Sequence, residues 1–193
     1  MTEKTISFDG NWKIIRQAGM DEVRVLNLPD VRQSTGYTCG AASLQAVLFY
    51  YGLDYRESTL AEYAGASKDA GTAPAGILKA IEKVNLEKET GLTAEIKQQA
   101  TIKDLEDYID REIPIIVNLQ AWKEKGNNAA WVDDWIDGHM LLLPDMMMTI
   151  SILKIPPCLM RWGKLIELNC WKDGMIMKEE LFMIRVHQLQ QKS

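Results

Sequence analysis

The sequence predicts an α+β fold in which a helical N-terminal lobe packs on an antiparallel sheet formed by later residues. Apolar side chains recur at helical spacing in several segments before residue 110. Strand-like apolar runs begin near residue 113, and residues 115–119 read as a buried strand. The chain has 193 residues, which is enough for one domain with a complete core.

The first predicted elements are an entry strand and a long apolar helix. Residues 1–24 are polar and weakly patterned, and residues 23–28 can form a strand that stops at Pro29. The next helix is predicted from Cys39 to about residue 51. Thr38 suits its N-cap, and Gly52 suits a left-handed cap at its C-terminal end.

Three further helices are marked by residues typical of a first turn. The signals for the three helices are the capping box Thr59-x-x-Glu62, the first-turn residue Pro74, and a second capping box, Thr101-x-x-Asp104. The Lys- and Glu-rich residues 82–97 are predicted to be a solvated helix face and loop.

Composition argues against several classes of function. The net charge of −5 and the lack of a basic aromatic patch argue against nucleic acid as a partner. The N-terminus has no apolar signal core, and Pro144, Asp145 and Lys154 interrupt the apolar run of the C-terminal part, so no membrane span is expected. Three cysteines do not make a disulfide framework, which predicts a cytoplasmic protein. The sequence gives no expectation for the oligomeric state.

Cys39 is the most informative single residue, because the predicted helix places its thiol on a first turn. Backbone N–H groups at a helix start, together with the helix dipole, favour an anion, so the nucleophilic thiolate is favoured there. The competing interpretation is structural, since a cysteine beside alanines on a helix is usually a small buried hydrophobe.

Two other residues favour the catalytic interpretation. Gln33 lies six positions before Cys39 in a glycine-containing loop, which can bring its amide beside the thiol as an oxyanion donor. His139 precedes an apolar run and is the only histidine before residue 187, so it is the candidate general base. A metal site from His139 with Asp133, Asp134 and Asp137 is the weaker interpretation, because no second His or Cys stands at ligand spacing. No cofactor is expected.

The segments around these residues resemble the C39-like peptidases, which are papain-like cysteine peptidases related to the domain that cleaves double-glycine leader peptides. The resemblance is specific in spacing and residue type. It is carried by residues 33–52, Ile113-Pro114-Ile115-Ile116-Val117, Gln120-Ala121-Trp122 and Asp134-Trp135-Ile136-Asp137-Gly138-His139.

The resemblance implies a papain-like fold and hydrolysis of peptide bonds in a peptide or protein substrate. It assigns Cys39 as nucleophile, His139 as general base and Gln33 as the oxyanion-hole side chain. The family's third catalytic member is an Asp in a Glu-Asp-Pro-Ser-like turn after the histidine, and Ile155 aligns with that Asp. The alternative is therefore a catalytically inactive domain that binds a peptide or partner.

The chain changes character after His139. Eight of the ten Met residues and none of the six Tyr fall in residues 140–193. Residues 1–139 carry 15 Lys and Arg against 22 Asp and Glu, a net of −7, whereas residues 140–193 carry 7 against 5, a net of +2.

These differences suggest a frameshift. Back-translation from Met140 in the neighbouring frame yields the family's Glu-Asp-Pro-Ser and an Arg-Trp-His-Asp-Tyr sequence. We therefore expect a single-base deletion, in the gene or in its sequencing, just after the His139 codon. The chain is then predicted to have three parts. Residues 1–24 are an N-terminal segment, 25–139 the C39-like domain, and 140–193 an aberrant tail that packs poorly, apart from a surviving strand directly after His139.

Overall fold

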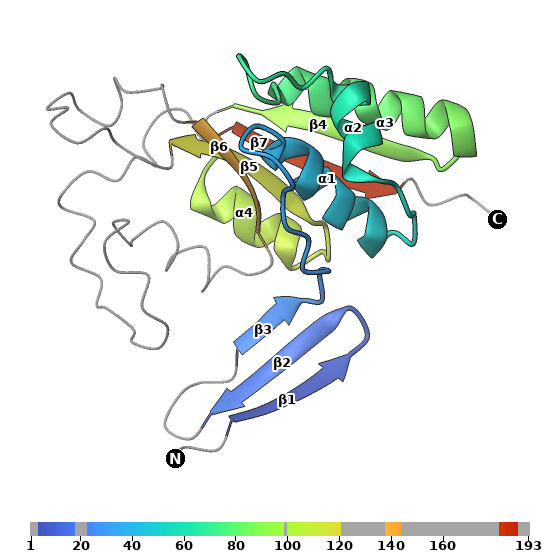
Figure 1. Ribbon diagram of the computed structural model, residues 1–193. Helices are drawn as coiled ribbons and strands as arrows, with labels where there is room; N and C mark the ends of the chain where they lie inside the picture. Colours follow the sequence, from blue (N-terminus) through green and yellow to red (C-terminus); the bar gives the residue numbers. More distant parts are fainter. Residues whose placement is uncertain (1–3, 18–22, 99, 121–137, 144–181, 189–193) are drawn as a thin grey trace, which may run out of the picture.

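The computed structural model describes residues 4–17, 23–98, 100–120, 138–143 and 182–188 (Figure 1). The strands and helices among them form two antiparallel sheets, ordered β1-β2-β3 and β4-β7-β5-β6, with four helices. The strands are β1 (Lys4–Asp9), β2 (Trp12–Gln17), β3 (Val23–Leu26), β4 (Leu92–Lys97), β5 (Ile115–Gln120), β6 (Gly138–Leu143) and β7 (Phe182–Gln188). The helices are α1 (Cys39–Tyr50), α2 (Glu57–Ala64), α3 (Pro74–Lys88) and α4 (Ile102–Ile109).

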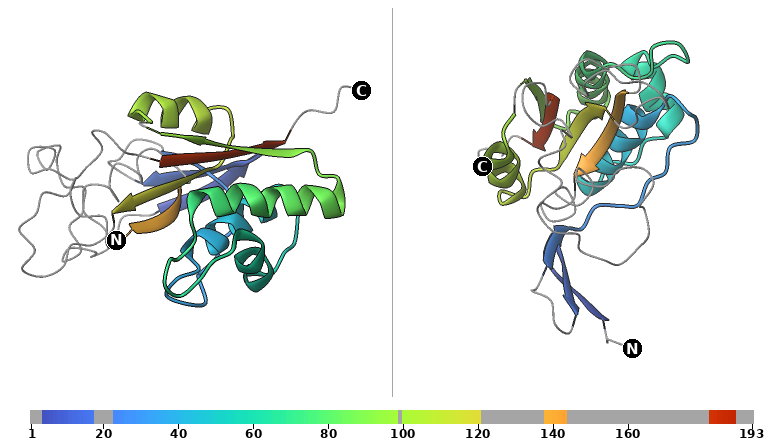
Figure 2. Two further views of the ribbon diagram at one scale, coloured as in Figure 1. Left: turned by 90° about the horizontal axis from the view of Figure 1, so that it is seen from above. Right: turned by 90° about the vertical axis from the view of Figure 1, so that its left-hand side faces the viewer.

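Helices cover both faces of the four-stranded sheet. Figure 2 shows α1, α2 and α3 on one face and α4 on the other. Strand β5 divides its side chains between them, since Ile116 joins the core under α1–α3, whereas Ile115 and Val117 join the core under α4. The run 115–119 was predicted to be a buried strand, and burial on both faces explains why it has no polar alternation.

Helix α1 begins and ends close to the predicted positions. Thr38 stands at the N-cap, but its side chain makes no capping hydrogen bond; it pairs instead with the Thr35 hydroxyl at 2.9 Å. Gly52 has φ = 75°, the left-handed conformation predicted for it, and its N–H donates to the carbonyl of Phe49.

The predicted start of α2 was wrong and those of α3 and α4 were confirmed. Helix α2 begins at Glu57 with Arg56 as N-cap, so Thr59 lies inside its first turn and forms no capping box with Glu62. Pro74 opens α3. Before α4 the capping box is formed in both directions, with Asp104 N–H donating to Thr101 Oγ1 and Thr101 N–H to Asp104 Oδ2. Hydrogen bonds to the Asp104 carboxylate from Lys97 and from the N–H and hydroxyl of Thr101 lower the pKa of Asp104 to about 2.

Strands occur earlier in the chain than predicted. Residues 92–97 form β4, so only the first part of the 82–97 segment is a solvated helix face. Residues 4–17 form a hairpin, although residues 1–24 were predicted to be weakly patterned. Its two-residue loop starts at Gly10, where φ = 56° favours a residue without a Cβ.

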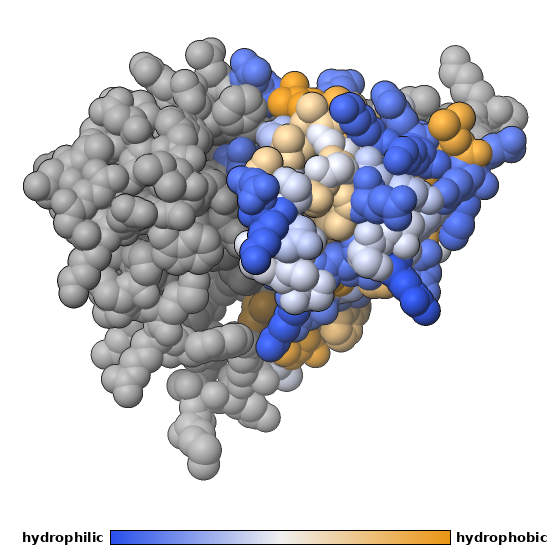
Figure 3. Space-filling view, turned by 45° about the horizontal axis from the view of Figure 1, so that its top comes forward, coloured by the Kyte–Doolittle hydropathy of each residue, from blue (hydrophilic) through white to orange (hydrophobic). Residues whose placement is uncertain are grey.

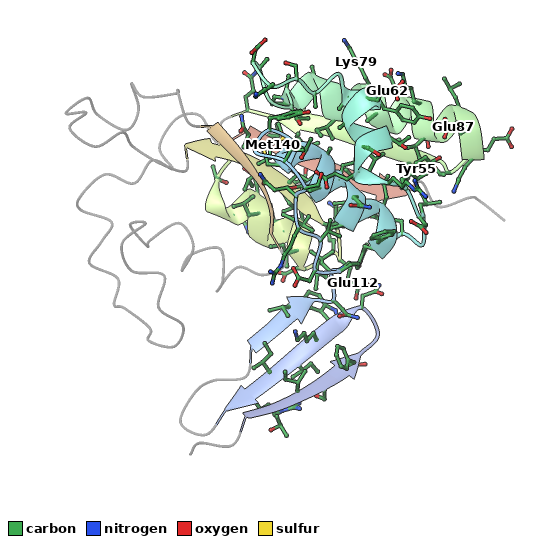
Figure 4. The ribbon with its side chains drawn as sticks, in the orientation of Figure 1. Tyr55, Glu62, Lys79, Glu87, Glu112 and Met140 are labelled. Atoms are coloured by element: carbon green, nitrogen blue, oxygen red, sulfur yellow. The ribbon has the colours of Figure 1, made fainter. Side chains whose placement is uncertain are left out.

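The hairpin is attached to the rest of the domain through Glu112, which lies between them in Figure 4. Its carboxylate accepts hydrogen bonds from Asn11 Nδ2 and Trp12 Nε1, both at 2.8 Å. Its carbonyl accepts one from the Tyr50 hydroxyl at the end of α1. Leu26 of β3 is buried in the core under α4, and the predicted boundary at residue 25 falls within β3.

The segment after residue 139 contributes more structure than predicted. Strand β6 pairs with β5, as expected for a strand that survives directly after His139. Strand β7, however, pairs with both β4 and β5, and Ile184 and Val186 are fully buried. The prediction of poor packing throughout 140–193 is therefore wrong for 182–188. Residues 144–181, including Ile155, lie outside the described residues.

The outer surface of the helical side is mainly hydrophilic. On the face drawn in Figure 3, charged and polar side chains separate the apolar ones into small groups. No helix in the described part of the chain is long and apolar enough to cross a membrane.

Candidate active site

Helix α1 places Cys39 at its first position. The first intrahelical bond runs from the N–H of Ala42 to the carbonyl of Thr38, so the N–H groups of residues 39–41 precede the helical ladder. Cys39 is a free cysteine, partly buried, and packs against the core under α1–α3. The thiol therefore combines partial access with a helix N-terminus, the setting predicted for a nucleophile.

The start of α1 packs closely against β6 and the loop before α3. A Cβ at Gly40 would lie 2.7 Å from Met140 Sδ and 2.8 Å from Thr72 Cβ, closer than carbon atoms pack. Ser43 adds a hydrogen bond to the carbonyl of Met140 at 3.5 Å. Figure 4 shows Met140 beside α1. A residue with any side chain at position 40 would therefore displace the Met140 side chain and press on Thr72.

This contact brings two sequence neighbours of the predicted catalytic pair together. Gly40 follows Cys39 and Met140 follows His139, although the two segments are about 100 residues apart. The backbone of His139 is fixed by its pairing with Leu119 in β5. The side chain of His139 lies outside the described residues. The predicted close approach of its ring to the Cys39 sulfur stays a prediction.

Gln33 lies in the loop before α1 and is exposed. Its side-chain Nε2 donates to the carbonyl of Thr35 at 2.8 Å, within its own loop. The amide is therefore held near the start of α1 by a local bond, and its NH2 group carries a second hydrogen that this bond does not use. Its predicted role as oxyanion donor is not tested by this arrangement.

Sequence reasoning missed two residues that shape this region. Thr72 is buried, touches the site of Gly40 and donates from its hydroxyl to the carbonyl of Tyr37 at 3.4 Å. Glu57 accepts a hydrogen bond from the backbone of the Gln33 loop. Both come from elements distant in sequence, and no local pattern predicts contacts of that kind.

The described side chains do not suggest a metal centre. Within the described ranges, no group of three or more His, Cys, Asp or Glu side chains is placed to hold an ion. The acidic residues Asp133, Asp134 and Asp137, weighed from the sequence as possible ligands with His139, lie outside the described residues.

Comparisons with known proteins support the resemblance seen in the sequence. The model of the peptidase C39 family matches residues 27–127. Among solved structures, the chain is similar to the peptidase domain of Streptococcus ComA, a bi-functional ABC transporter involved in a quorum-sensing pathway. Identity to that domain is 22% and the TM-score is 0.41; the match covers 60% of this chain and 97% of that one. No curated protein matches the chain. The mixture of helices and antiparallel sheet confirms the predicted α+β fold class, and the family match confirms the resemblance to C39 peptidases.

Proposed function

The chain belongs to the peptidase C39 family, and we propose that it cleaves peptide bonds in a peptide or protein substrate with Cys39 as nucleophile. His139 is the proposed general base, and Gln33 with the backbone N–H of Cys39 is the proposed oxyanion hole. The cytoplasm is the compartment proposed for this reaction, on the grounds of the cysteine usage.

The contact between Gly40 and Met140 is the observation that best supports this proposal. It joins the helix start that carries Cys39 to the strand that carries His139. A nucleophile and a base from distant segments need this proximity, because proton transfer requires approach to hydrogen-bonding distance.

The proposed reaction proceeds in two steps. His139 takes the proton of the Cys39 thiol, the sulfur attacks the carbonyl carbon, and the oxygen takes the displaced electron pair while Gln33 and the Cys39 N–H donate to it. The tetrahedral intermediate expels the amine, which takes a proton from His139. Water then hydrolyses the thioester with His139 as base, which frees the acid and regenerates the thiol.

A second candidate is an inactive C39 domain that binds a peptide or partner, or an inactive frameshifted product. The sequence favours it at one position, because Ile155 aligns with the family's orienting Asp and cannot hold an imidazole in one tautomer. Sequencing the gene around codon 139 tests the frameshift. If the deletion is real, the frame-restored protein should hydrolyse peptides much faster than the chain that carries Ile155.

Alkylation of Cys39 separates the two candidates. We expect iodoacetamide at pH 6 to label Cys39 at least about tenfold faster in the folded protein than in the same protein unfolded in urea. Mass spectrometry of the Cys39 peptide distinguishes this site from Cys158 and Cys170. Equal rates in the folded and unfolded protein would show an unactivated thiol and favour the inactive domain.

A further inference from the structure

We propose that Glu57, at the start of α2, is a positioning residue that fixes the loop carrying Gln33 and thereby aligns the oxyanion hole. This inference rests on the proposed function, since it assigns a support to that site. It adds a residue that neither the family motifs nor the local sequence pattern indicates.

Glu57 holds the loop at the residue directly after Gln33. The backbone N–H of Ser34 donates to both carboxylate oxygens of Glu57, at 3.1 Å and 3.0 Å. Ser34 lies in an exposed loop, whereas Glu57 is half-buried in α2, so the accepting carboxylate belongs to the more tightly packed of the two segments. A bond to an ionised acceptor is stronger than a neutral one and restrains the loop from outside.

The other end of the loop is tied to the domain independently. The hydroxyls of Thr35 and Thr38 are 2.9 Å apart, and Thr38 is buried at the helix start. The carbonyl of Tyr37 accepts a hydrogen bond from Thr72, which also touches the site of Gly40. Residues 35–38 are thus held whether or not Glu57 is present.

Glu57 restrains the Gln33 side of the loop from a separate element, the helix α2. The Gln33 amide also bonds to the carbonyl of Thr35, but this single neutral bond joins a side chain to a residue two positions away and does not fix the backbone at residues 33 and 34. Loss of Glu57 should therefore let Gln33 shift while Cys39, on the firmly packed α1, stays in place. A misplacement of about 1 Å at a reacting group is enough to cost about 100-fold in rate.

Two probes of Cys39 separate alignment of the oxyanion hole from activation of the thiol. With a peptide aldehyde ending in Gly-glycinal, the Cys39 sulfur bonds to the aldehyde carbon, the electron pair of the C=O bond moves to oxygen, and that oxygen takes a proton. No group leaves, and the oxygen occupies the oxyanion hole. Iodoacetamide instead forms a C–S bond as iodide leaves, and no oxyanion develops. The aldehyde's affinity is measured by how well it protects Cys39 from alkylation, read by mass spectrometry in the full chain.

Glu57→Ala should weaken aldehyde binding about tenfold and leave the alkylation rate without aldehyde unchanged. Glu57→Gln keeps an acceptor and should bind the aldehyde nearly as the parent protein does. In a Gln33→Ala background, Glu57→Ala should add nothing, because it acts through Gln33. Glu62→Ala, which removes an exposed acid from the same helix, is the matched control and should change neither probe.

Three results would overturn the inference: unchanged aldehyde affinity in Glu57→Ala, an equal loss in both probes, or an effect that persists in full without Gln33. If the aldehyde still protects Cys39 of the parent protein from alkylation, none of these three results contradicts the peptidase proposal. If the parent protein shows neither aldehyde protection nor fast alkylation, the peptidase proposal itself fails and Glu57 has no site to position.

Discussion

The two sides of the main core are held by different means. On the helical side, close approaches depend on single glycines: a Cβ at Gly76 would lie 2.2 Å from the backbone carbonyl oxygen of Ala64, and a Cβ at Gly40 would meet the side chains of Met140 and Thr72. On the strand side, β6 and β7 contribute backbone ladders and the buried side chains of Met140, Ile184 and Val186.

This difference shows which side is sensitive to sequence detail. A position in an antiparallel sheet accepts any segment with apolar residues at alternating positions, because the ladder uses only backbone groups. Helices that approach through a glycine accept no other residue there. Residues 182–188 can therefore fill a central strand even if their reading frame is shifted, which is why β7 does not by itself decide the origin of the tail.

Gly76→Ala should have the largest effect on stability. Gly76 lies in the first turn of α3, where alanine gains at most about 1 kcal/mol over glycine, but the clash with Ala64 forces α2 and α3 apart, and we expect a net loss of about 4 kcal/mol. Urea unfolding measures it. Gly36→Ala is the control, because nothing lies within 4 Å of its added Cβ, and it should stay within about 0.5 kcal/mol of the parent. Equal effects of the two substitutions would show that α2 and α3 do not approach this closely.

Ile184→Ala should have the next largest effect and tests the strand side directly. Ile184 is fully buried under α1–α3, so truncation should cost about 3 kcal/mol, and Ile184→Val about 1 kcal/mol. A loss of unfolding free energy that is larger for Ile184→Ala than for Ile184→Val shows that the buried side chain, and not substitution in β7 as such, is responsible. If neither change lowers the free energy of unfolding, β7 does not belong to the core, and the poorly packed tail predicted from the sequence is correct for 182–188 as well.

The sequence predicted those parts of the fold that leave a local signature. Pro74, the Thr101–Asp104 capping box and Gly52 each act within one turn of chain, and all three signals were confirmed. The Thr59–Glu62 spacing failed because the same pattern also occurs inside a helix, where α2 had already begun at Glu57. The N-terminal hairpin could have been found from Gly10-Asn11 between Phe8 and Trp12.

The contacts around the site could not be predicted in this way. Cys39 was found because a helix start leaves a signature, but Thr72 and Glu57 reach the site through tertiary packing. Their role depends on which elements meet in space. The catalytic roles of Cys39, His139 and Gln33 remain predictions.

The smallest expected effect lies at the bond between Tyr51, the residue directly after α1, and β7. The Tyr51 hydroxyl donates to the carbonyl of Val186 at 2.7 Å, so Tyr51→Phe should cost about 1 kcal/mol at pH 7. Tyr50→Phe is the control, since it removes a similar bond to Glu112 and leaves β7 untouched.

Alkaline pH gives the comparison between these two tyrosines a second measurement. Burial, and then the neighbouring Tyr50, raises the pKa of Tyr51, while burial and Glu112 raise the pKa of Tyr50 to about 12. An unfolded tyrosine titrates near pH 10, so above about that pH the unfolded state loses protons that the folded state keeps. The contribution to stability is therefore complete below about pH 10 and declines as pH rises toward the folded-state pKa.

Phenylalanine cannot ionise, so the difference in unfolding free energy between the parent protein and Tyr51→Phe should shrink between about pH 10 and 11.5. A difference that stays constant over that range would mean that the Tyr51 hydroxyl titrates alike in both states, and that β7 does not cover it.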